Sequence, residues 1–412
     1  MSPRAASTVA RPAAAGGMPW WRRQVLDRLS RLAEGRLAVR DGWGEATLGQ
    51  PAPDGLAGRV HVHEPRFWRR VATGGTLGAA EAYADGDWDA DDLTAVVRVL
   101  ARNADALDAV EGGLARLRRP VDALAHALRR NTRGGSRRNI AEHYDLGNDF
   151  FALMLDPTMT YSCALFERED ATLEEASVAK IDRLCRKLRL RPQDHLLEIG
   201  TGWGSLALHA ASRYGCRVTT TTISRRQREL AVERVERAGL ANRVQVLHSD
   251  YRDLTGRFDK LVSVEMLEAV GHRYYPAFFA KCASLLHAHG LLALQVITIP
   301  DQRYAQHLRD VDFIKRHVFP GSNIPSVTAL LHAAVASSDL RLRHLEDIGP
   351  HYARTLAAWR ENLARHGAEV EAITEPRFRR LWHFYLCYCE AAFAEGYIGD
   401  AQMLLSRPRA GW

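Results

Sequence analysis

From residue 172 onward, apolar and polar positions follow two alternating periods. Residues 172–190 carry apolar side chains at 173, 178, 181, 184 and 188, a helical spacing that follows a capping box of Thr172 and Glu175. Short apolar runs then alternate with helical segments. The predicted strands are 195–200, 217–223, 244–247, 259–264 and 291–299, and the predicted helices between them are 205–215, 225–239 and 276–290. The connections are too long for hairpins, so the pattern predicts an α/β fold with a parallel, doubly wound sheet.

Residues 18–115 carry mixed signals. Alternation around Asp41-Gly42 predicts a hairpin over 36–49, residues 58–65 predict another short strand, and residues 64–75 switch to helical spacing. Residues 19–35 predict an amphipathic helix. Its apolar face would hold Trp20, Val25, Leu29 and Leu32, with Arg22, Arg23 and Arg31 elsewhere. Two interpretations stay open: a surface helix packed on its own domain, or an interfacial helix with tryptophans near lipid headgroups.

The two ends of the chain differ from its middle. Residues 1–17 are rich in Ala, Pro and Gly and lack the apolar core of a signal peptide, so they predict a disordered lead-in. Residues 301–412 lose the strand alternation, and the aromatic-rich segment 378–398 predicts a helix. Residues 282–300 and 319–338 lack charged side chains, but neither is the continuous apolar span that a bilayer requires.

Charge favours an anionic partner. The 56 Lys and Arg residues exceed the 49 Asp and Glu residues, which leaves a net charge of +7 and points to a nucleic acid or a membrane surface. Residues 116–138 hold eight arginines against one acid, Asp122, and are predicted to be a basic linker between domains at 18–115 and 139–412. Such a run is either a solvated face or a phosphate contact. Six cysteines without CxxC spacing indicate reduced cytosolic thiols rather than zinc ligands.

A glycine-rich turn lies where the first strand of the α/β region ends. Residues 198–204 read EIGTGWG, so the spacing is GxGxG rather than the GxGxxG of dinucleotide binders, and no P-loop lysine follows. Glycines there allow close approach to a ligand, and the following helix presents free N–H groups. Glu198, two residues before Gly200, stands where S-adenosylmethionine-dependent methyltransferases carry an acid beside the methionine moiety. The strand–turn–helix context predicts such an enzyme.

The next two strand ends are less informative. Many such folds end the second strand with an acid for the ribose hydroxyls, but here Thr221, Thr222, Ile223 and Ser224 follow. Ser224 and Gln227 have capping-box spacing, which would give Gln227 a structural role. After the third strand, Asp250-Tyr251 either places a ring beside the adenine or uses Asp250 to cap a turn.

Motifs on both sides of the turn resemble cyclopropane-fatty-acyl-phospholipid synthases. They lie at 139–151 (NIAEHYDLGNDFF), 155–163 (LDPTMTYSC), 222–227 (TISRRQ), 263–271 (SVEMLEAVG) and 351–359 (HYARTLAAW). Residues 67–71 and 74–88 match the helical N-terminal domain of the bacterial synthases, so the resemblance spans roughly residues 30–405. It implies a Rossmann-like class I methyltransferase domain with a doubly wound, mostly parallel sheet, preceded by a smaller, mainly helical domain.

The resemblance also implies an activity. The family transfers a methyl group from S-adenosylmethionine to a cis double bond of a phospholipid acyl chain, after which a proton is lost and the ring closes. By resemblance, the cofactor would be held by Tyr161, Ser162, Leu196, Glu198, Gly200, Thr201, Gly202, Trp203, Gly204, Thr222, Ile223, Ser224, Gln227, Tyr251 and Arg252. A bicarbonate that accepts the proton would be held by groups matching Cys163, Glu268, the backbone at Ile297, and Tyr352.

One position departs from the pattern. The best-known bacterial members have His where this chain has Gln295, and Gln cannot titrate near neutral pH. The branch that includes plant cyclopropane synthases also carries Gln there. We keep Gln295 among the candidate catalytic residues with Cys163, Glu268, Ile297 and Tyr352, and expect Glu265 to support Glu268.

These observations predict a peripheral enzyme at the inner face of the cytoplasmic membrane, with phospholipid acyl chains as substrate, an anionic surface as partner and a homodimer left open. Alternatives are the same olefin methylation ending in a methyl-branched or methylene chain, or a small-amine N-methyltransferase, against which Cys163 and the N-terminal domain argue. A basic nucleic-acid-binding protein is a third alternative, which no DNA- or RNA-binding motif supports.

Overall fold

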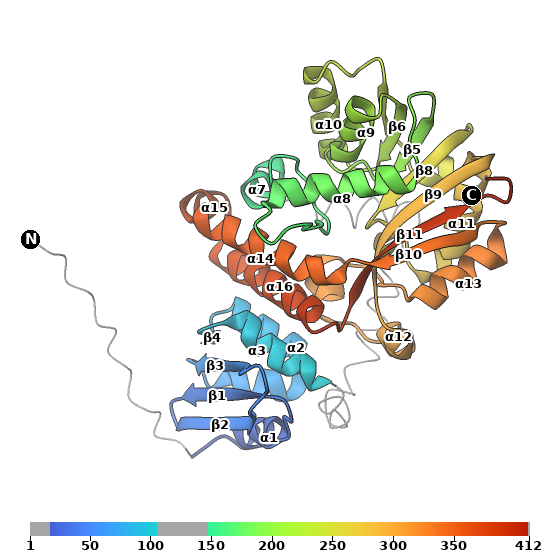
Figure 1. Ribbon diagram of the computed structural model, residues 1–412. Coiled ribbons are helices and arrows are strands. Elements are labelled where there is room, and N and C mark those ends of the chain that lie inside the picture. The colour runs from blue at the N-terminus through green and yellow to red at the C-terminus, as the bar shows by residue number, and fades with distance from the viewer. Residues whose placement is uncertain (1–16, 105–146, 411–412) are drawn as a thin grey trace, which may run out of the picture. The chain divides into compact units, whose positions relative to one another are not determined.

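The computed structural model describes residues 17–104 and 147–410, which belong to two units, residues 1–118 and 119–412 (Figure 1). Residues 1–16 of the expected lead-in, the expected linker at 116–138 and residues 139–146 lie outside the described residues. The domain limits expected from the sequence therefore stay predictions.

Within residues 17–104, the N-terminal unit combines three helices with a four-stranded sheet of order β2-β1-β3-β4. More of its described residues lie in helices than in strands. The elements are α1 (Trp20–Leu29), β1 (Gly35–Asp41), β2 (Gly44–Gln50), β3 (Ala57–Val62), α2 (Arg66–Ala84), β4 (Trp88–Ala90) and α3 (Leu93–Arg102). β1 and β2 pair antiparallel with Asp41 opposite Gly44, which confirms the predicted hairpin. The predicted strand at 58–65 and helix at 64–75 correspond to β3 and the start of α2.

Only part of the face predicted for helix α1 is buried. Arg22 is buried, and its Nε donates to Asp41 Oδ2 at 2.6 Å, whereas Trp20 is 51% exposed. The Arg22 guanidinium also lies 5.8 Å from the ring centroid of Trp68. A buried carboxylate at the end of the hairpin therefore draws the arginine inward, because a desolvated charge is tolerated when it is paired. Val25 and Leu32 are buried as predicted.

The second unit is built on a seven-stranded sheet of order β10-β11-β9-β8-β5-β6-β7. Its strands are β5 (His195–Ile199), β6 (Arg217–Thr222), β7 (Val244–His248), β8 (Phe258–Val264), β9 (Leu286–Thr298), β10 (Arg341–Asp347) and β11 (Gly399–Ser406). β5 to β9 are mutually parallel, and β11 lies antiparallel between β9 and β10. The predicted parallel sheet is confirmed.

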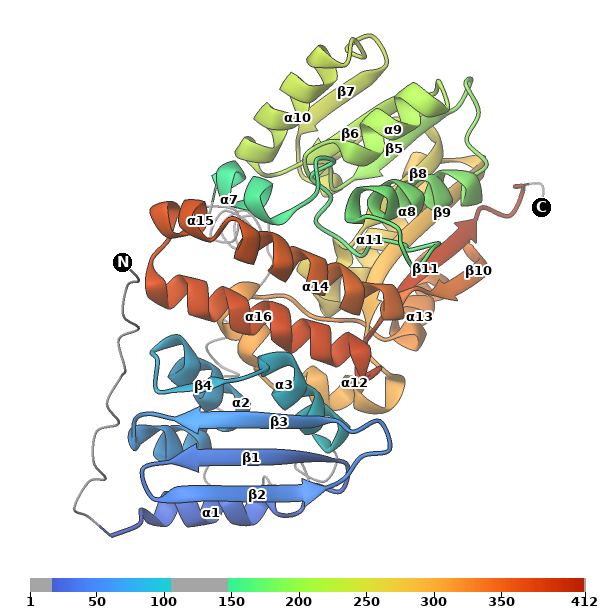
Figure 2. The ribbon, with the colours of Figure 1, turned by 60° about the vertical axis from the view of Figure 1, so that its left-hand side comes forward.

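Helices cover both faces of this sheet (Figure 2). They are α7 (Gly147–Met154), α8 (Leu173–Lys187), α9 (Ser205–Arg213), α10 (Arg225–Arg237), α11 (Tyr275–Leu285), α12 (Asp301–His307), α13 (Val327–Ser337), α14 (Gly349–Arg365), α15 (Gly367–Ile373) and α16 (Pro376–Ala394), with short 3₁₀ or π turns at Tyr251–Asp253, Leu267–Ala269, His272–Tyr274 and Ile314–Val318. Leu196 packs in the core under α8 and α9, and its neighbour Leu197 packs in the core under α11 and α13. Successive residues of β5 therefore face opposite helical layers, as a doubly wound sheet requires. The predicted capping box of Thr172 and Glu175 is present at the start of α8.

Two features differ from the predicted elements. The predicted helix at 276–290 ends at Leu285, and the residues after it begin β9. Residues 301–412, where no strand was predicted, contain β10 and β11. β11 is buried along nearly its whole length, yet its buried side chains include Asp400 and Gln402, so it lacks the continuous apolar run expected of a strand covered on both faces. In the described parts of the chain, no helix combines the length and apolarity needed to cross a bilayer.

Candidate functional site

The glycine-rich turn has the backbone that its sequence predicts. Gly200, Gly202 and Gly204 have φ values of +102°, +51° and +91°, in the region that favours glycine. The backbone N–H groups of Gly200 and Thr201 donate to the Thr221 carbonyl at 3.0 and 3.1 Å, which ties the turn to the end of β6. No heavy atom lies within 4 Å of the position that a Cβ at Gly202 would take. The turn therefore presents an open cradle of backbone.

A cavity of about 350 Å³ begins at this turn and extends to α16. Most residues expected to hold the cofactor line it: Tyr161, Ser162, Glu198, Gly200, Thr201, Gly202, Trp203, Thr222, Ile223, Gln227, Tyr251 and Arg252. Three expected residues do not line it. Leu196 is in the core of the sheet, Gly204 packs against Ala231 of α10, and Ser224 caps α10.

Hydroxyl groups surround Glu198 at the floor of this region. The buried Glu198 carboxylate accepts a hydrogen bond from Thr220 Oγ1 at 2.6 Å, and Thr220 Oγ1 lies 2.7 Å from Thr201 Oγ1. Burial raises the pKa of Glu198 to about 8. In the absence of an acid at the end of β6, Thr222 Oγ1 donates to Gln227 Oε1 at 2.8 Å. This bond leaves the Gln227 amide NH₂ as a donor on the cavity wall.

The two alternatives for Asp250 and Tyr251 are both compatible with the geometry. The Asp250 carboxylate caps the turn that follows it and pairs with Arg252 at 2.6 Å. Tyr251 lines the cavity and packs edge-on against Phe278. Asp250 is therefore a structural cap that holds the Tyr251–Arg252 pair at the rim.

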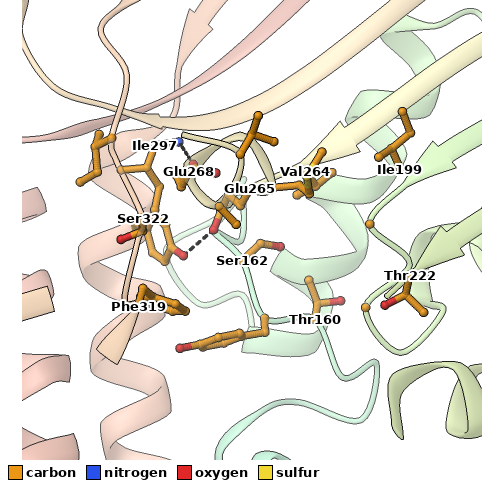
Figure 3. Close-up of a pocket in the computed structure, with 18 of the residues that line it drawn as sticks. Thr160, Ser162, Ile199, Thr222, Val264, Glu265, Glu268, Ile297, Phe319 and Ser322 are labelled. Atoms are coloured by element: carbon orange, nitrogen blue, oxygen red, sulfur yellow. Dashed lines mark hydrogen bonds between the residues drawn. The ribbon is translucent and has the colours of Figure 1, made fainter. Parts of the chain in front are cut away.

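Two carboxyl groups lie together at the far side of the cavity (Figure 3). Glu265 follows β8 directly and Glu268 lies in the 3₁₀ turn Leu267–Ala269. Oε1 of Glu268 accepts a hydrogen bond from the Ile297 N–H at 2.6 Å, and its Oε2 is buried without a hydrogen-bond partner among the described residues. Burial, and next the charge of Glu265, raise the pKa of Glu268 to about 8. Glu268 is therefore mostly a neutral acid at pH 7.

The Glu265 carboxylate accepts three hydrogen bonds, none of which could be predicted from the sequence. Its Oε1 accepts from the Cys163 backbone N–H and from Gln295 Nε2, each at 2.8 Å, and its Oε2 accepts from Tyr352 Oη at 2.6 Å. Its backbone φ is +47°. The sequence predicted a supporting role beside Glu268, yet Glu265 is the carboxylate on which the donors converge.

Cys163 and Gln295 are buried and do not line the cavity. The Cys163 thiol is fully buried and donates to the Ala164 carbonyl at 3.2 Å, and burial raises its pKa well above the ordinary value, so it stays a thiol. Gln295 Nε2 also donates to Asp400 Oδ2 at 3.0 Å, and Gln295 Oε1 accepts from Gln402 Nε2 at 3.0 Å. Among the five expected catalytic residues, Glu268, Ile297 and Tyr352 line the cavity and these two do not.

Lys180 of α8 is a site residue that the sequence analysis missed. It is 2% exposed, lines the cavity, and its Nζ donates to Ser162 Oγ at 2.6 Å. The charges of Glu265 and Asp400 favour its protonated form, although burial lowers its pKa overall. Helical spacing places it on the face that also buries Ser177, Ile181 and Leu184, so the pattern carried a signal for a buried lysine.

Aromatic side chains form the remaining wall. Tyr161 and Tyr385 share a hydrogen bond between their hydroxyls at 2.9 Å, and the Tyr352 ring stacks on Phe393 at 4.4 Å. Phe319, Tyr388 and Tyr397 complete the lining. The site thus joins a backbone cradle to an apolar chamber that holds two acids.

Comparison with known proteins identifies the architecture. The family model "Mycolic acid cyclopropane synthetase" matches residues 131–403. The chain is 38% identical over 392 residues to the tuberculostearic acid methyltransferase of Mycobacterium tuberculosis, covering 93% of this chain and 91% of that protein. It is 36% identical over 350 residues to the cyclopropane-fatty-acyl-phospholipid synthase of Escherichia coli, covering 84% and 87%.

A solved structure agrees. The mycolic acid cyclopropane synthase CmaA1 complexed with SAH and CTAB superposes with a TM-score of 0.62 at 33% identity, over 66% of this chain and 98% of that one. Both the resemblance seen in the sequence and the expected class I methyltransferase fold are confirmed. The chain belongs to the mycolic acid cyclopropane synthetase family of S-adenosylmethionine-dependent methyltransferases.

Proposed function

We propose that the protein transfers a methyl group from S-adenosylmethionine to the cis double bond of an unsaturated acyl chain in membrane phospholipid, and that loss of a proton closes a cyclopropane ring. One observation carries the proposal: a single cavity joins the glycine-rich cradle to a pair of partly buried acids and an aromatic wall. The similarity to a cyclopropane-fatty-acyl-phospholipid synthase supports the substrate class.

The cradle fits the methyl donor. The donor supplies an electrophilic sulfonium methyl group. Open backbone at Gly202 leaves room for its methionine end, and Glu198 with the N-terminus of α9 would bind polar groups there. Gln227 and Tyr251 line the part of the cavity where the ribose and adenine would lie.

The rest of the cavity suits a lipid. An alkene is a weak nucleophile, so the chain must hold it close to the methyl group in a chamber that excludes water. Methyl transfer leaves a carbocation on the acyl chain. The faces of Tyr161, Tyr352 and Tyr385 stabilise a cation without bonding to it covalently.

The groups that the resemblance assigns to bicarbonate are already engaged. The Cys163 N–H and the Tyr352 hydroxyl donate to Glu265, and the Ile297 N–H donates to Glu268. A bicarbonate would find these donors occupied and would face the Glu265 carboxylate. The residues present therefore do not fit that ion, and the proposed reaction uses no step through it.

A second product is favoured by a specific observation. The tuberculostearic acid methyltransferase matches 93% of this chain. The alternative reaction shares the methyl transfer. A hydride then shifts from the methylated carbon to the neighbouring cation, and loss of a proton from the transferred methyl gives a methylene chain. A saturated methyl-branched chain would need a further hydride from a separate reductant. Both reactions need the same cavity and a base.

Expression in a bacterial host that lacks the activity tests the proposal. Mass spectrometry of fatty acid methyl esters should show chains heavier by one CH₂ unit, and retention separates cyclopropane from methylene and methyl-branched products. The Gly202→Val variant serves as the inactive control. Unchanged fatty acids in cells that contain the folded protein would refute the function.

The cellular location follows as part of the proposal. A phospholipid acyl chain must be taken from a bilayer, so the protein would act at the inner face of the cytoplasmic membrane as a peripheral protein. The arginine-rich residues 116–138 supply the charge for an anionic surface.

A further inference from the structure

We propose that Glu265 is the proton acceptor of this reaction, a base built into the chain in place of a bound bicarbonate. The inference rests on the proposed function, because it concerns the proton that leaves the methylated acyl chain. It assigns to Glu265 the role that the sequence analysis gave to an ion held by Glu268.

The donors around Glu265 support this assignment. A bound bicarbonate needs hydrogen-bond donors for its negative oxygens. Three such donors converge on Glu265 from separate segments: the N–H of Cys163, the amide of Gln295 and the hydroxyl of Tyr352, at 2.6 to 2.8 Å. The chain therefore places its own carboxylate where the expected anion would bind.

The charges around the site support it as well. Lys180 is buried at the same cavity, where burial lowers its pKa and the charge of Glu265 opposes that shift. Burial raises the pKa of Asp400 well above its ordinary value, and the pKa of Glu268 is also raised. Glu265 and Lys180 are therefore side chains of opposite formal charge that line one cavity. A further anion would add an uncompensated buried charge, which is unfavourable.

Glu265 can reach the reacting atoms. Glu265 lines the cavity that also contains the cradle and the aromatic wall. It lies beside Glu268 in the cavity lining (Figure 3). Its Oε2 accepts a hydrogen bond from Tyr352, and a carboxylate oxygen has a second lone pair that can take a proton.

The step balances without a further reactant. The sulfonium methyl bonds to one alkene carbon, and S-adenosylhomocysteine leaves as the carbocation forms on the other carbon. A C–H bond of the transferred methyl then breaks. Its electron pair forms the third ring bond, and its proton moves to the Glu265 carboxylate. The resulting carboxylic acid returns the proton to water after the product leaves.

The backbone at Glu265 is strained in a way that indicates function. A φ of +47° is uncommon for a residue with a side chain, and such conformations persist where the surroundings hold them. The same conformation makes Glu265→Gly an informative variant. Glycine adopts this φ without strain, and its missing carboxylate leaves three donors open to an added anion.

The experiment compares the purified wild type, Glu265→Gln and Glu265→Gly in CO₂-depleted buffer with and without added bicarbonate. The wild type should methylate phospholipid vesicles equally well in both. Glu265→Gln should lose about 10² to 10⁴-fold in turnover and gain nothing from bicarbonate. Glu265→Gly should be equally slow alone and recover in part with bicarbonate, which takes the vacated donors.

Controls separate a lost base from a lost fold. Calorimetric titration with S-adenosylmethionine should match the wild type for folded variants, and each should still unfold in one cooperative thermal transition, even if at a lower temperature. Glu371→Gln, an exposed change on α15, should keep full activity. If Glu265→Gln does not fold, Glu265→Gly and the wild type still decide the question.

Contrary results are distinct. A wild type that needs bicarbonate, a fully active Glu265→Gln or Glu265→Gly without bicarbonate, or a folded Glu265→Gly that bicarbonate does not restore would each overturn the role of Glu265. A wild type that leaves every lipid unchanged would instead refute the proposed function.

Discussion

Lys180 Nζ lies 2.6 Å from Ser162 Oγ, and both side chains are buried against the cavity. Ser162 belongs to the segment expected to bind the methyl donor, and Lys180 also interacts through its charge with Glu265. One lysine therefore links the donor side of the cavity to the carboxylate side. The pair fixes the loop 161–163, whose next backbone N–H, at Cys163, donates to Glu265.

We predict that Lys180→Met destabilises the protein and weakens binding of S-adenosylmethionine. Removing one partner of a buried charge cluster costs about 3–5 kcal/mol because the remaining charges are left unpaired. The double variant Lys180→Met/Glu265→Gln should recover part of that loss, since it removes the opposing carboxylate charge. Urea unfolding of the wild type, the two single variants and the double variant measures the interaction free energy between the two side chains.

Lys281→Met on α11, which is partly exposed, is the matched control for this cycle. It should change the free energy of unfolding by less than about 0.5 kcal/mol. Strict additivity of Lys180→Met and Glu265→Gln would show that the two charges do not interact.

A second prediction concerns the cradle. Gly202→Val should lower the affinity for S-adenosylmethionine at least tenfold, because the new side chain fills the space that is open at Gly202. Part of the effect on stability comes from the positive φ of +51° rather than from the ligand. Gly239→Val separates the two, since Gly239 has φ +68° and open surroundings but lies outside the cavity lining. It should lose stability and keep its affinity in calorimetric titration.

A third prediction follows from the neutral state of Glu268. The pKa rises from 4.5 in the unfolded chain to about 8 in the folded protein, so between these values the folded state binds the extra proton. Stability from this group is complete below pH 4.5 and is lost as pH rises to about 8. Between these pH values, the free energy of unfolding should fall less steeply for Glu268→Gln than for the wild type, by roughly 1.4 kcal/mol per pH unit. Urea unfolding of both proteins at pH 5, 6.5 and 8 measures it.

Turnover adds a second readout for Glu268. If it acts as a neutral acid, Glu268→Gln should stay within about tenfold of wild-type turnover at pH 7, in contrast to Glu265→Gln. Parallel stability curves for Glu268→Gln and the wild type would argue that Glu268 is ionised in the folded protein.

Local signals predicted most of the fold, and long-range contacts account for the differences. The hairpin at Asp41 and the capping box at Thr172 depend on neighbours a few residues away, and both formed as predicted. Arg22 is buried because Asp41, 19 residues later, accepts its hydrogen bond. β11 was missed because buried Asp400 and Gln402 interrupt the apolar run expected of a strand covered on both faces, and they are tolerated there through contacts with distant residues such as Gln295.

The same distinction between local signals and long-range contacts applies to the site. Glu198 and the glycines are contiguous, so one motif predicted the cradle. The donors to Glu265 lie 102, 30 and 87 residues away in sequence, at Cys163, Gln295 and Tyr352. No local spacing could show that they converge on that carboxylate. The motif match therefore predicted the central role for Glu268 rather than for Glu265.

A fourth prediction concerns the membrane. Sedimentation with vesicles should increase with the fraction of anionic lipid and decrease with salt, because the arginines at 116–138 attract a negative surface that salt screens. Replacing Arg129, Arg130 and Arg133 with Gln should weaken binding by roughly 1 kcal/mol per residue near the surface. Replacing exposed Arg225, Arg228 and Arg237 of α10 removes the same charge elsewhere and should have less effect. Equal losses for the two triple variants would indicate net charge alone.

A last prediction isolates the hydroxyl that holds Glu265. Tyr352→Phe keeps the ring stacked on Phe393 but removes the donor to Glu265 Oε2. Because a hydrogen bond to a charged group contributes about 1.5–3 kcal/mol, turnover should fall about tenfold to a hundredfold, with KM for S-adenosylmethionine unchanged. Tyr214→Phe is the matched control: Tyr214 donates to Asp182 at 2.7 Å outside the cavity lining, so its loss should affect stability and leave turnover intact. Steady-state kinetics on vesicles measures both. If Tyr352→Phe kept full turnover, the carboxylate would be oriented by Cys163 and Gln295 alone. If KM rose while turnover held, Tyr352 would act in binding the donor rather than in positioning the base.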